Sequence, residues 1–352
     1  MRSNRIGPMD FSGVSMCGFT YADAGVDIDK KGNAVENLVN LLNFKRKGRF
    51  RALNLKGHFA GGIEFEKYVL VLSTDGVGTK LLIAKALNKW DTVGIDCIAM
   101  NVDDVLCIGA EPVAFVDYIA TPYIDKQLLT QIAKGLNEGA KMANVSIVGG
   151  ETAVMKDVVC DLDLSGTALG IVEKKKLITG KAIRDGDLIV GFPSSGLHSN
   201  GYTLVRKILE KNGIEYTAKP DNFEKNIGEI LLEPTRIYVK DVIPLLDKYS
   251  IHGMAHITGG GLRNLIRLHP EREFRITDPL PVPAIFHYIQ KLGRVDLREM
   301  YQTFNMGMGF CIIVPKRDAL DIVKETDGKI VGEVRKGKGA SLPQHKIKFE
   351  AY

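Results

Sequence analysis

The sequence predicts a protein of the α/β class, with some α+β character, built from two domains. Its 352 residues exceed the size of about 250–300 residues at which one hydrophobic core usually stops growing. Apolar, β-branched segments alternate with segments of helical periodicity in both halves of the chain. A lysine-rich stretch at 173–180 separates the halves, so we expect domains at 1–172 and 181–352.

Composition and charge indicate an ordinary globular protein. Hydrophobic residues make up 45% and charged residues 25% of the chain. The formal charge of +5 comes without a long basic tract, so nothing predicts nucleic-acid binding. Five cysteines without a CxxC pair indicate reduced thiols. The chain shows neither a signal peptide nor an apolar run of the ~18 residues that a membrane span needs. We therefore expect a cytoplasmic protein with no membrane partner.

The first expected helix follows Asn33. Asn33 and Glu36 have the spacing of a capping pair, and the apolar positions between 35 and 42 share one face. The preceding residues, 21–29, alternate carboxylates as a calcium loop does. Lys31 stands where such a loop needs an oxygen ligand, so we exclude calcium. The glycine-rich segment at 56–63 is either a hairpin or a flap over a ligand.

A strand that ends in a carboxylate is the centre of the predicted site. The uncharged run at 68–72 predicts a buried strand, and Asp75 follows it. Gly76 and Gly78 allow backbone N–H groups to approach an anion. Asp75 offers an oxygen ligand for Mg²⁺, and Lys80 offers a positive charge. The spacing fits neither a P-loop nor a dinucleotide fingerprint, so an ordinary strand-to-helix turn stays an alternative.

A second carboxylate lies on an apolar helix. Residues 92–109 predict a helix on which Asp104 shares the apolar stripe. An unpaired buried carboxylate costs several kcal/mol, so such a group is usually paired or metal-bound. We therefore predict that Asp104 faces Asp75 as a second metal ligand, although an acidic edge that touches water is the alternative. Whether Asp103 or Asp104 holds the metal stays open.

A third carboxylate repeats the design of the first. After an expected strand at 113–119 and an expected helix at 125–143, the segment Ser146–Thr152 again has strand, two glycines and a carboxylate, here Glu151. Asp75, Asp104 and Glu151 together predict an oxygen-lined Mg²⁺ site for nucleotide phosphates. A strand at 162–172 is expected to close the first half.

The second half carries two more glycine-rich loops. Its expected strands are 188–192, 310–314 and 330–334, and its expected helices are 202–210, 234–246 and 317–324. The loop at 193–201 places Ser195, His198 and Asn200 before a helix N-terminus, which is an anion site. It lacks the spacing of a serine nucleophile elbow. The turn at 256–262 suits a phosphate or ribose, or is simply a tight turn.

Taken together, these motifs resemble one enzyme family. The matching segments, in chain order, are 21–29, 75–80, 101–104 with 109–112, 149–152, 194–202, 234–236, 256–261 and 300–307. They resemble the phosphoribosylformylglycinamidine cyclo-ligases, also called aminoimidazole ribonucleotide synthetases. The resemblance implies a cytoplasmic homodimer with an N-terminal sheet that pairs across the dimer and a C-terminal α/β domain. It implies an ATP- and Mg²⁺-dependent ring closure of formylglycinamidine ribonucleotide, releasing ADP and phosphate, in purine biosynthesis.

The resemblance also implies roles for single residues. Asp75, Asp104 and His198 are the implied catalytic residues, with Asp75, Asp104 and Glu151 as metal ligands. The implied nucleotide-binding residues are Gly61, Gly62, Gly76, Gly78, Thr79, Lys80, Gly150, Glu151 and Thr152. The implied substrate-binding residues are Ser195, His198, Asn200, Gly259, Gly260 and Gly261. Two departures stand out: Ala22 replaces a lysine of some relatives, and the loop around Gly61 is shorter than in others.

Other functions compete with this one. Thiamine-phosphate kinase and selenophosphate synthetase share the ATP core of this superfamily. The second would need a reactive cysteine near a glycine-rich N-terminus, and Cys17 has the wrong surroundings. A non-catalytic nucleotide-binding protein would be expected to lose the carboxylates, and all three are present.

Overall fold

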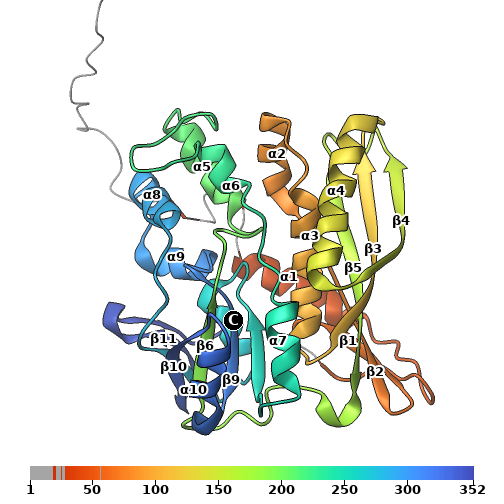
Figure 1. Ribbon diagram of the computed structural model, residues 1–352, viewed down its shortest axis with the longest axis vertical. Helices are drawn as coiled ribbons and strands as arrows, with labels where there is room; N and C mark the ends of the chain where they lie inside the picture. The colour runs from red at the N-terminus through yellow and green to blue at the C-terminus, as the bar shows by residue number, and fades with distance from the viewer. Residues whose placement is uncertain (1–18, 21–24, 26–27, 56) are drawn as a thin grey trace, which may run out of the picture.

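The protein is built from two β-sheets with helices between them. The computed structural model describes residues 19–352 except 21–24, 26–27 and 56. The first sheet has five strands in the order β1-β2-β5-β3-β4, and the second has seven in the order β12-β11-β8-β10-β6-β9-β7. Figure 1 shows α3, α4 and α7 in the layer that separates the two sheets. The two sheets draw their strands from residues 61–173 and 188–349 respectively.

The first half supplies the smaller sheet and the helices that cover it. Its elements are α1 (Ile28–Leu41), β1 (Gly61–Phe65), β2 (Tyr68–Gly76), the 3-10 helix η1 (Gly78–Lys80), α2 (Leu81–Leu87), α3 (Val93–Leu106), β3 (Glu111–Thr121), α4 (Lys126–Ala143), β4 (Ser146–Val154) and β5 (Asp163–Glu173). The predicted strands and helices from 68 to 172 are confirmed, with ends shifted by a few residues. The glycine-rich segment before them is a hairpin, because β1 pairs antiparallel with β2.

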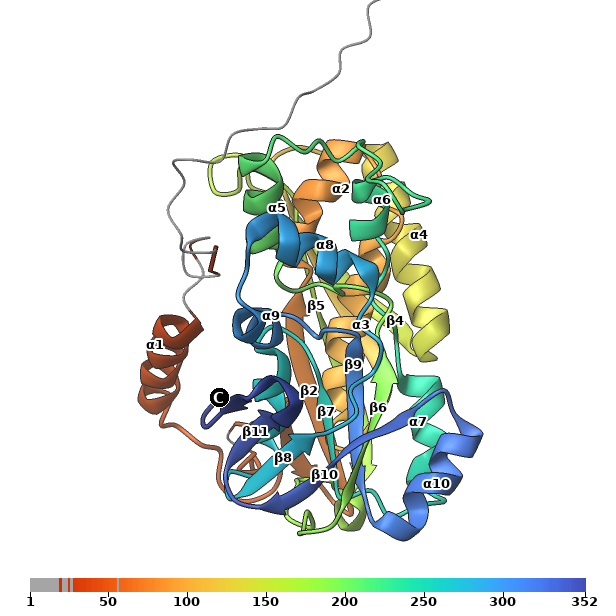
Figure 2. The same cartoon turned by 90° about the vertical axis from the view of Figure 1, so that its left-hand side faces the viewer.

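The first helix differs from its prediction. α1 begins at Ile28, before the expected cap at Asn33, and it ends at Leu41. Its apolar positions Leu38 and Leu41 are exposed, and Figure 2 shows the helix apart from both sheets. Much of the preceding motif, including Ala22, lies outside the described residues, as does Cys17.

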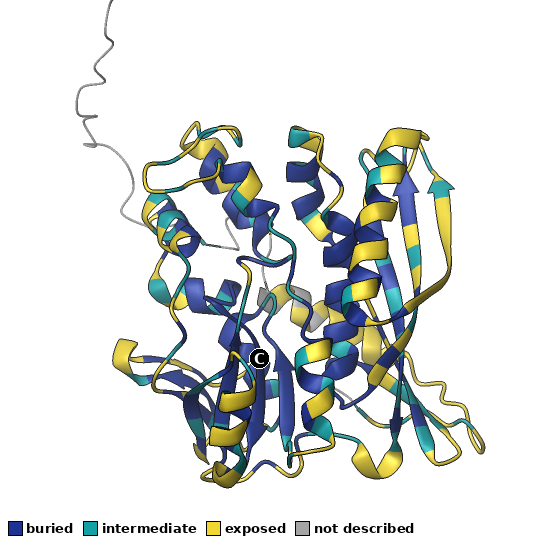
Figure 3. Cartoon of the chain, in the orientation of Figure 1, coloured by how far each residue is buried: buried dark blue, intermediate teal, exposed yellow. Residues whose placement is uncertain are grey.

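The small sheet has one covered and one open face. Along β2 the side chains of Val69 and Val71 are fully buried, whereas Leu72 is exposed. This alternation follows from the period of two along a strand. Helix α3 packs on the covered face and is buried along almost its whole length. The other face carries exposed apolar side chains, and β4 is exposed at eight of its nine positions (Figure 3).

The second half supplies the larger sheet. Its elements are η2 (Lys174–Lys176), β6 (Leu188–Pro193), α5 (Tyr202–Lys211), α6 (Ile227–Leu231), α7 (Val239–Leu246), β7 (Gly253–His256), η3 (Gly261–Arg267), β8 (Arg272–Ile276), α8 (Ala284–Gly293), α9 (Leu297–Thr303), β9 (Met308–Val314), α10 (Lys316–Glu325), β10 (Lys329–Lys336), β11 (Gly339–Leu342), η4 (Pro343–His345) and β12 (Ile347–Phe349). Among the described helices, none is both long and apolar enough to cross a membrane.

One predicted helix of this half starts later than expected. The helix expected from Pro234 begins only at Val239. The backbone N–H of Thr235 donates to Asp96 Oδ1 at 2.7 Å, and that of Tyr238 donates to Asp103 Oδ1 at 3.0 Å. These two amides therefore serve carboxylates of α3 in place of helical carbonyls.

Candidate functional site

Two carboxylates face the helices from the small sheet. Asp75 follows the buried positions of β2 by strand alternation, so it points to the covered face. Asp75 is paired with Gly166 of β5, and Gly166 is paired in turn with Asp117 of β3. Asp117 therefore faces the same way. Its next partner is Gly150, where an added Cβ would lie 2.5 Å from Asp117 Oδ1, so only a glycine leaves the carboxylate its place.

Helix α3 lies over Asp75, Gly166 and Asp117 and brings the side-chain amide of Asn101 close to Asp75. Asn101 Nδ2 donates to the carbonyl oxygen of Asp75 at 3.1 Å and to that of Cys97 at 2.8 Å. Asn101 is fully buried, and its Oδ1 has no hydrogen-bond partner among the described residues. Burial, followed by the negative charges of Asp117, Asp96 and Asp75, raises the pKa of the Cys97 thiol. Asp75, Asp96 and Asp117 therefore lie close enough to one thiol to act on it together.

One turn further along α3, Asp104 meets the second half of the protein. Asp104 Oδ1 lies 3.0 Å from Nδ1 of His256, which is fully buried at the end of β7. Burial alone would lower the pKa of His256, but the hydrogen bond to Asp104 and the charges of Asp104, Asp103 and Asp75 raise it. Asp75 and Asp104 therefore lie close enough to act on the same imidazole. His256 Nε2 has no partner among the described residues.

Asp103, the neighbour of Asp104, has a different environment. Its side chain is fully buried and accepts the bond from Tyr238 described above. Burial raises the pKa of Asp103 to about 7. Asp103 therefore fastens α3 to the second half, whereas Asp104, which is partly exposed, is the carboxylate that a ligand can reach.

Lys80 is placed differently from the expectation that it lies beside phosphates. Its side chain is fully buried, and Nζ donates to Asp96 Oδ1 at 2.8 Å, to the carbonyl of Glu233 at 2.7 Å and to that of His198 at 3.1 Å. All three ammonium protons are used inside the protein. In this geometry Lys80 joins the two halves, and no proton is left to donate to a phosphate.

Glu151 is not brought to the other two carboxylates. The short strand expected before its glycines is longer than predicted, because β4 continues through Gly149, Gly150 and Glu151 to Val154. Glu151 is paired with Tyr118, one position beyond the pair of Gly150 with Asp117. It therefore points to the open face of the sheet. Asp75 points to the covered face three strands away, which is about 14 Å at the usual strand spacing.

The remaining nucleotide-side residues lie at the end of β2, in the turn after it, and in β1 and β4. Gly78 has φ +70° and opens η1, and Thr79 Oγ1 lies 3.1 Å from Thr203 Oγ1 of α5. Gly76 N–H donates to Asp75 Oδ1 at 2.7 Å. Gly61 and Gly62 lie in β1 opposite Leu72 and Val71, while Thr152 lies in β4 opposite Ile119.

Two of the predicted substrate-side elements meet at α3. Asn200 Nδ2 lies 4.0 Å from the sulfur of Met100, one turn before Asp104. An added Cβ at Gly259 would lie 2.8 Å from Asn200 Oδ1. Gly261 has φ +52°, and an added Cβ there would lie 2.0 Å from the carbonyl oxygen of Tyr301. Gly260, between them, has φ +128°. The glycine turn and the loop at 193–201 therefore approach α3 near Met100 from the second half.

His198 is buried rather than open to a ligand. It is 1% exposed, and its Nε2 accepts from the backbone N–H of Ser195 at 3.3 Å. Burial, followed by the charges of His256, Lys80 and Arg236, holds the pKa of His198 well below its usual range. Its Nδ1 has no partner among the described residues. Ser195 Oγ itself donates to the carbonyl of Pro234 at 2.6 Å. The neutral imidazole therefore fixes the loop that carries Ser195 and Asn200.

The donor set suits a hard cation that shares its ligands with a substrate. Within the described residues, no three His, Cys, Asp or Glu side chains lie together as a metal site of their own. Asp75, Asp104 and Asp117 nevertheless offer carboxylate oxygens, and Asn101 offers an unpartnered amide oxygen. Mg²⁺ commonly takes one or two carboxylates and completes its shell with phosphate oxygens and water. The arrangement fits Mg²⁺ that arrives with a nucleotide.

Sequence reasoning missed several residues of this region. Asp117 gave one signal, a single carboxylate within an apolar strand, but its partner across the sheet could not be known without the register. Asp96 lies on the predicted helix, yet nothing in the chain near it indicates that Lys80 and Thr235 are its partners. His256 was noted as part of a glycine turn, and its bond to Asp104 spans 152 positions.

This architecture places the chain in a recognised class of two-domain proteins. The family model described as AIR synthase related protein, N-terminal domain, matches residues 57–172, and the model of the C-terminal domain matches residues 184–343. The protein of Methanosarcina acetivorans named phosphoribosylformylglycinamidine cyclo-ligase is 51% identical over 316 residues, which cover 90% of this chain and 94% of that protein. The protein of the same name from Methanocaldococcus jannaschii is 51% identical over 313 residues, 87% of each chain. The chain belongs to the phosphoribosylformylglycinamidine cyclo-ligase family, a family of ligases.

Solved structures share the fold at low identity. A structure described as AaThiL complexed with AMPPCP and TMP aligns with a TM-score of 0.66 and 16% identity, covering 93% of this chain and 99% of that one. The crystal structure of E. coli HypE aligns with a TM-score of 0.60 and 17% identity, covering 80% and 85%. These likenesses establish the fold alone.

Proposed function

We propose that this chain catalyses the ATP-dependent cyclisation of formylglycinamidine ribonucleotide to aminoimidazole ribonucleotide in de novo purine biosynthesis. The observation that carries this proposal is the 51% identity to a cyclo-ligase over 90% of the chain. Both substrates are small, charged and water-soluble, so we place the enzyme in the cytoplasm.

The reaction takes place in two steps. The γ-phosphoryl group of ATP passes to the formyl oxygen, which makes that oxygen a leaving group. The amidine-side nitrogen then attacks the formyl carbon, the imidazole ring closes, and phosphate departs, with ADP as the other product. The protein contributes mainly by holding nitrogen, carbon and phosphoryl group in one geometry.

In this proposal Asp75 and Asp104 hold Mg²⁺. The bound ion would neutralise charge on the phosphates. Two observations support this. The charges of both carboxylates raise the pKa of His256, so both lie near the same imidazole. In addition, Asn101 Oδ1 has no hydrogen-bond partner among the described residues. Asp117 points to the same face of the sheet as Asp75 and has no cationic partner among the described residues. Glu151, which faces the open side of the sheet, would need a different contact to reach the same ion.

The loops at the two ends of the site indicate where each substrate would bind. In the turn after β2 the N–H groups of Gly76 and Val77 are taken by Asp75 and Leu164, so those of Gly78 and Thr79 would be the donors to the ATP phosphates. Asn200 and the glycines from 259 to 261 line the side from which formylglycinamidine ribonucleotide would approach. The buried His198 holds the loop that carries Asn200 in place. We expect its loss to impair use of the substrate more than binding of the nucleotide.

We also propose a homodimer that buries the open face of the small sheet. Exposed apolar side chains gather on or beside this face from three strands: Leu72, Val113, Val116, Tyr118 and Val148. Monomeric proteins rarely expose large contiguous apolar patches. A second copy would cover this face by the same residues, because a two-fold interface is self-complementary.

A direct assay tests the function. The purified chain would be mixed with ATP, Mg²⁺ and formylglycinamidine ribonucleotide, and formation of the aminoimidazole would be followed. Thiamine phosphate in place of the ribonucleotide is the control for the kinase alternative. Formation of the aminoimidazole from the ribonucleotide, with thiamine phosphate left unphosphorylated, supports the proposal. Phosphorylation of thiamine phosphate without ring closure of the ribonucleotide would contradict it.

A further inference from the structure

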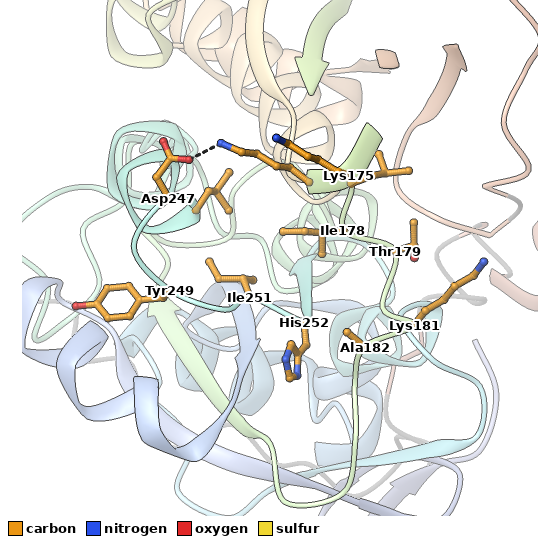
Figure 4. Close-up of a pocket in the computed structure, with 12 residues that line it drawn as sticks. Lys175, Ile178, Thr179, Lys181, Ala182, Asp247, Tyr249, Ile251 and His252 are labelled. Atoms are coloured by element: carbon orange, nitrogen blue, oxygen red, sulfur yellow. Dashed lines mark hydrogen bonds and ion pairs between the residues drawn. The ribbon is translucent and has the colours of Figure 1, made fainter. Parts of the chain in front are cut away.

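A cavity lies at the junction of the two halves, on a part of the surface that contains none of the carboxylates described above. Its volume is about 460 Å³, within the range of about 300–1,000 Å³ that is usual for small-molecule sites. One wall is η2 and the connector that follows β5. The other wall is the end of α7 and the residues that lead into β7, up to His252 (Figure 4).

The rim of this cavity is positively charged. Lys175, Lys176 and Lys181 line it, against a single carboxylate, Asp247. Lys176 Nζ lies 2.7 Å from Asp247, and Lys175 Nζ lies 3.2 Å from Glu173. Lys181 has no hydrogen-bond or charged partner among the described residues. The rim therefore keeps an excess of positive charge, with the free ammonium on the connector.

The connector adds backbone donors to this charge. The amide N–H groups of Thr179, Lys181 and Ala182 donate to no acceptor within the described part of the chain. Between them Gly180 has φ +75°, and an added Cβ there would lie 2.0 Å from the carbonyl of Leu268, so the turn is fixed by packing. Successive free N–H groups beside ammonium groups are the donors that a phosphate group uses.

One part of the cavity lining, here called its floor, carries apolar side chains among the polar ones. Leu177 and Ile178 from the connector face Leu246 and Ile251 from the opposite wall, and Figure 4 shows Ile178 and Ile251 turned toward the middle of the cavity. His252 is held by Asp187, with Nδ1 2.7 Å from Oδ2, so its ring forms a fixed edge. An organic group attached to a phosphate would cover these side chains, whereas a free inorganic ion would leave them uncovered.

We propose that this cavity binds a nucleoside monophosphate, with the phosphate at Lys175, Lys181 and the connector amides, and the base between Ile178 and Ile251. The site is separate from the one that serves the proposed reaction, and neither lysine belongs to that machinery. It spans both halves of the chain, and its far wall continues through β7 to His256.

Methyl NMR of the full-length protein tests this directly, with AMP as the probe. Saturable shifts of the Ile178 and Ile251 δ1-methyl signals on addition of AMP are expected, while the methyl signal of Ile132, a fully buried residue of α4, stays in place. The double variant K175A/K181A should weaken AMP binding at least tenfold, because two charge-assisted contacts are lost. Ring-closing turnover without AMP should be unchanged in that variant, which also shows that it is folded.

The matched control is K219A/K338A, which removes two exposed lysines that do not line the cavity. It should bind AMP as the unmodified protein does. Inorganic phosphate should bind more weakly than AMP, because it leaves the apolar floor uncovered. The proposal is overturned if AMP leaves both methyl signals unmoved, if K175A/K181A binds AMP as tightly as the control, or if phosphate binds as tightly as AMP.

Discussion

Replacing Lys80 by methionine tests whether this lysine joins the two halves or serves a phosphate. Its ammonium is fully buried and donates to Asp96 and to the carbonyls of His198 and Glu233. Removing one partner of a buried ion pair typically costs about 3–5 kcal/mol. Asp96 would keep two bonds from Thr235, at 2.7 Å and 2.6 Å. We therefore expect Lys80→Met to lower the free energy of unfolding by about 3 kcal/mol, at the lower end of that range.

Urea unfolding at 25 °C measures this change, with two comparisons. Lys85→Met removes an exposed lysine that is paired with Asp161, and no measurable change is expected. Adding Asp96→Asn to Lys80→Met removes the uncompensated charge and should restore part of the lost stability. A variant Lys80→Met as stable as the parent, but with weakened ATP binding, would refute the assigned joining role and favour a phosphate contact.

Three further outcomes follow from single positions. An alanine at Gly166 would place its Cβ 2.1 Å from the Phe115 ring and should cost about 1–3 kcal/mol of stability, whereas the matched Gly149→Ala meets only Val116 at 3.9 Å and should be nearly neutral in thermal unfolding. Burial, followed by the charge of Arg267, lowers the pKa of His58 to about 4. The unfolded chain then binds more protons between pH 6.5 and 4, so stability should fall by about 3 kcal/mol on acidification through this window. His58→Gln should flatten that part of the pH profile, and an unchanged slope would contradict the assignment. Val116→Glu should dissociate the proposed dimer in sedimentation velocity, while Leu320→Glu, at an exposed apolar residue of α10, should not; dissociation by both, or by neither, would argue against the sheet face as the interface.

The order of elements was largely predictable because it depends on local pattern. α3 and α4 follow from helical periodicity, and β2, β3 and β9 follow from apolar runs. The start of α7 was not predictable, since the amides of Thr235 and Tyr238, which precede it, donate to Asp96 and Asp103 from more than 130 positions away. The start of α1 was missed because a capping pattern also occurs inside helices.

The site was predictable in its residue types more than in its geometry. Glycines and a carboxylate after an apolar run predicted Asp75 as a metal ligand, and its position on the covered face came only from the structure. Helical spacing placed Asp104 on the apolar stripe of its helix. The orientation of Glu151 depends on an irregularity in the pairing of β3 with β4, between Phe115 and Val116. A one-residue change in register exchanges the two faces of a strand. The burial of Lys80 and His198 likewise depends on partners from the other half, which local pattern does not reveal.

The most direct test of the account is to locate the metal. A crystal of this protein with a non-hydrolysable ATP analogue and Mn²⁺ in place of Mg²⁺ would show the ion by its anomalous scattering. We expect a peak at bonding distance from carboxylate oxygens of Asp75 and Asp104 and from the phosphates. A peak bound by neither carboxylate, with the nucleotide elsewhere on the chain, would contradict the proposed site.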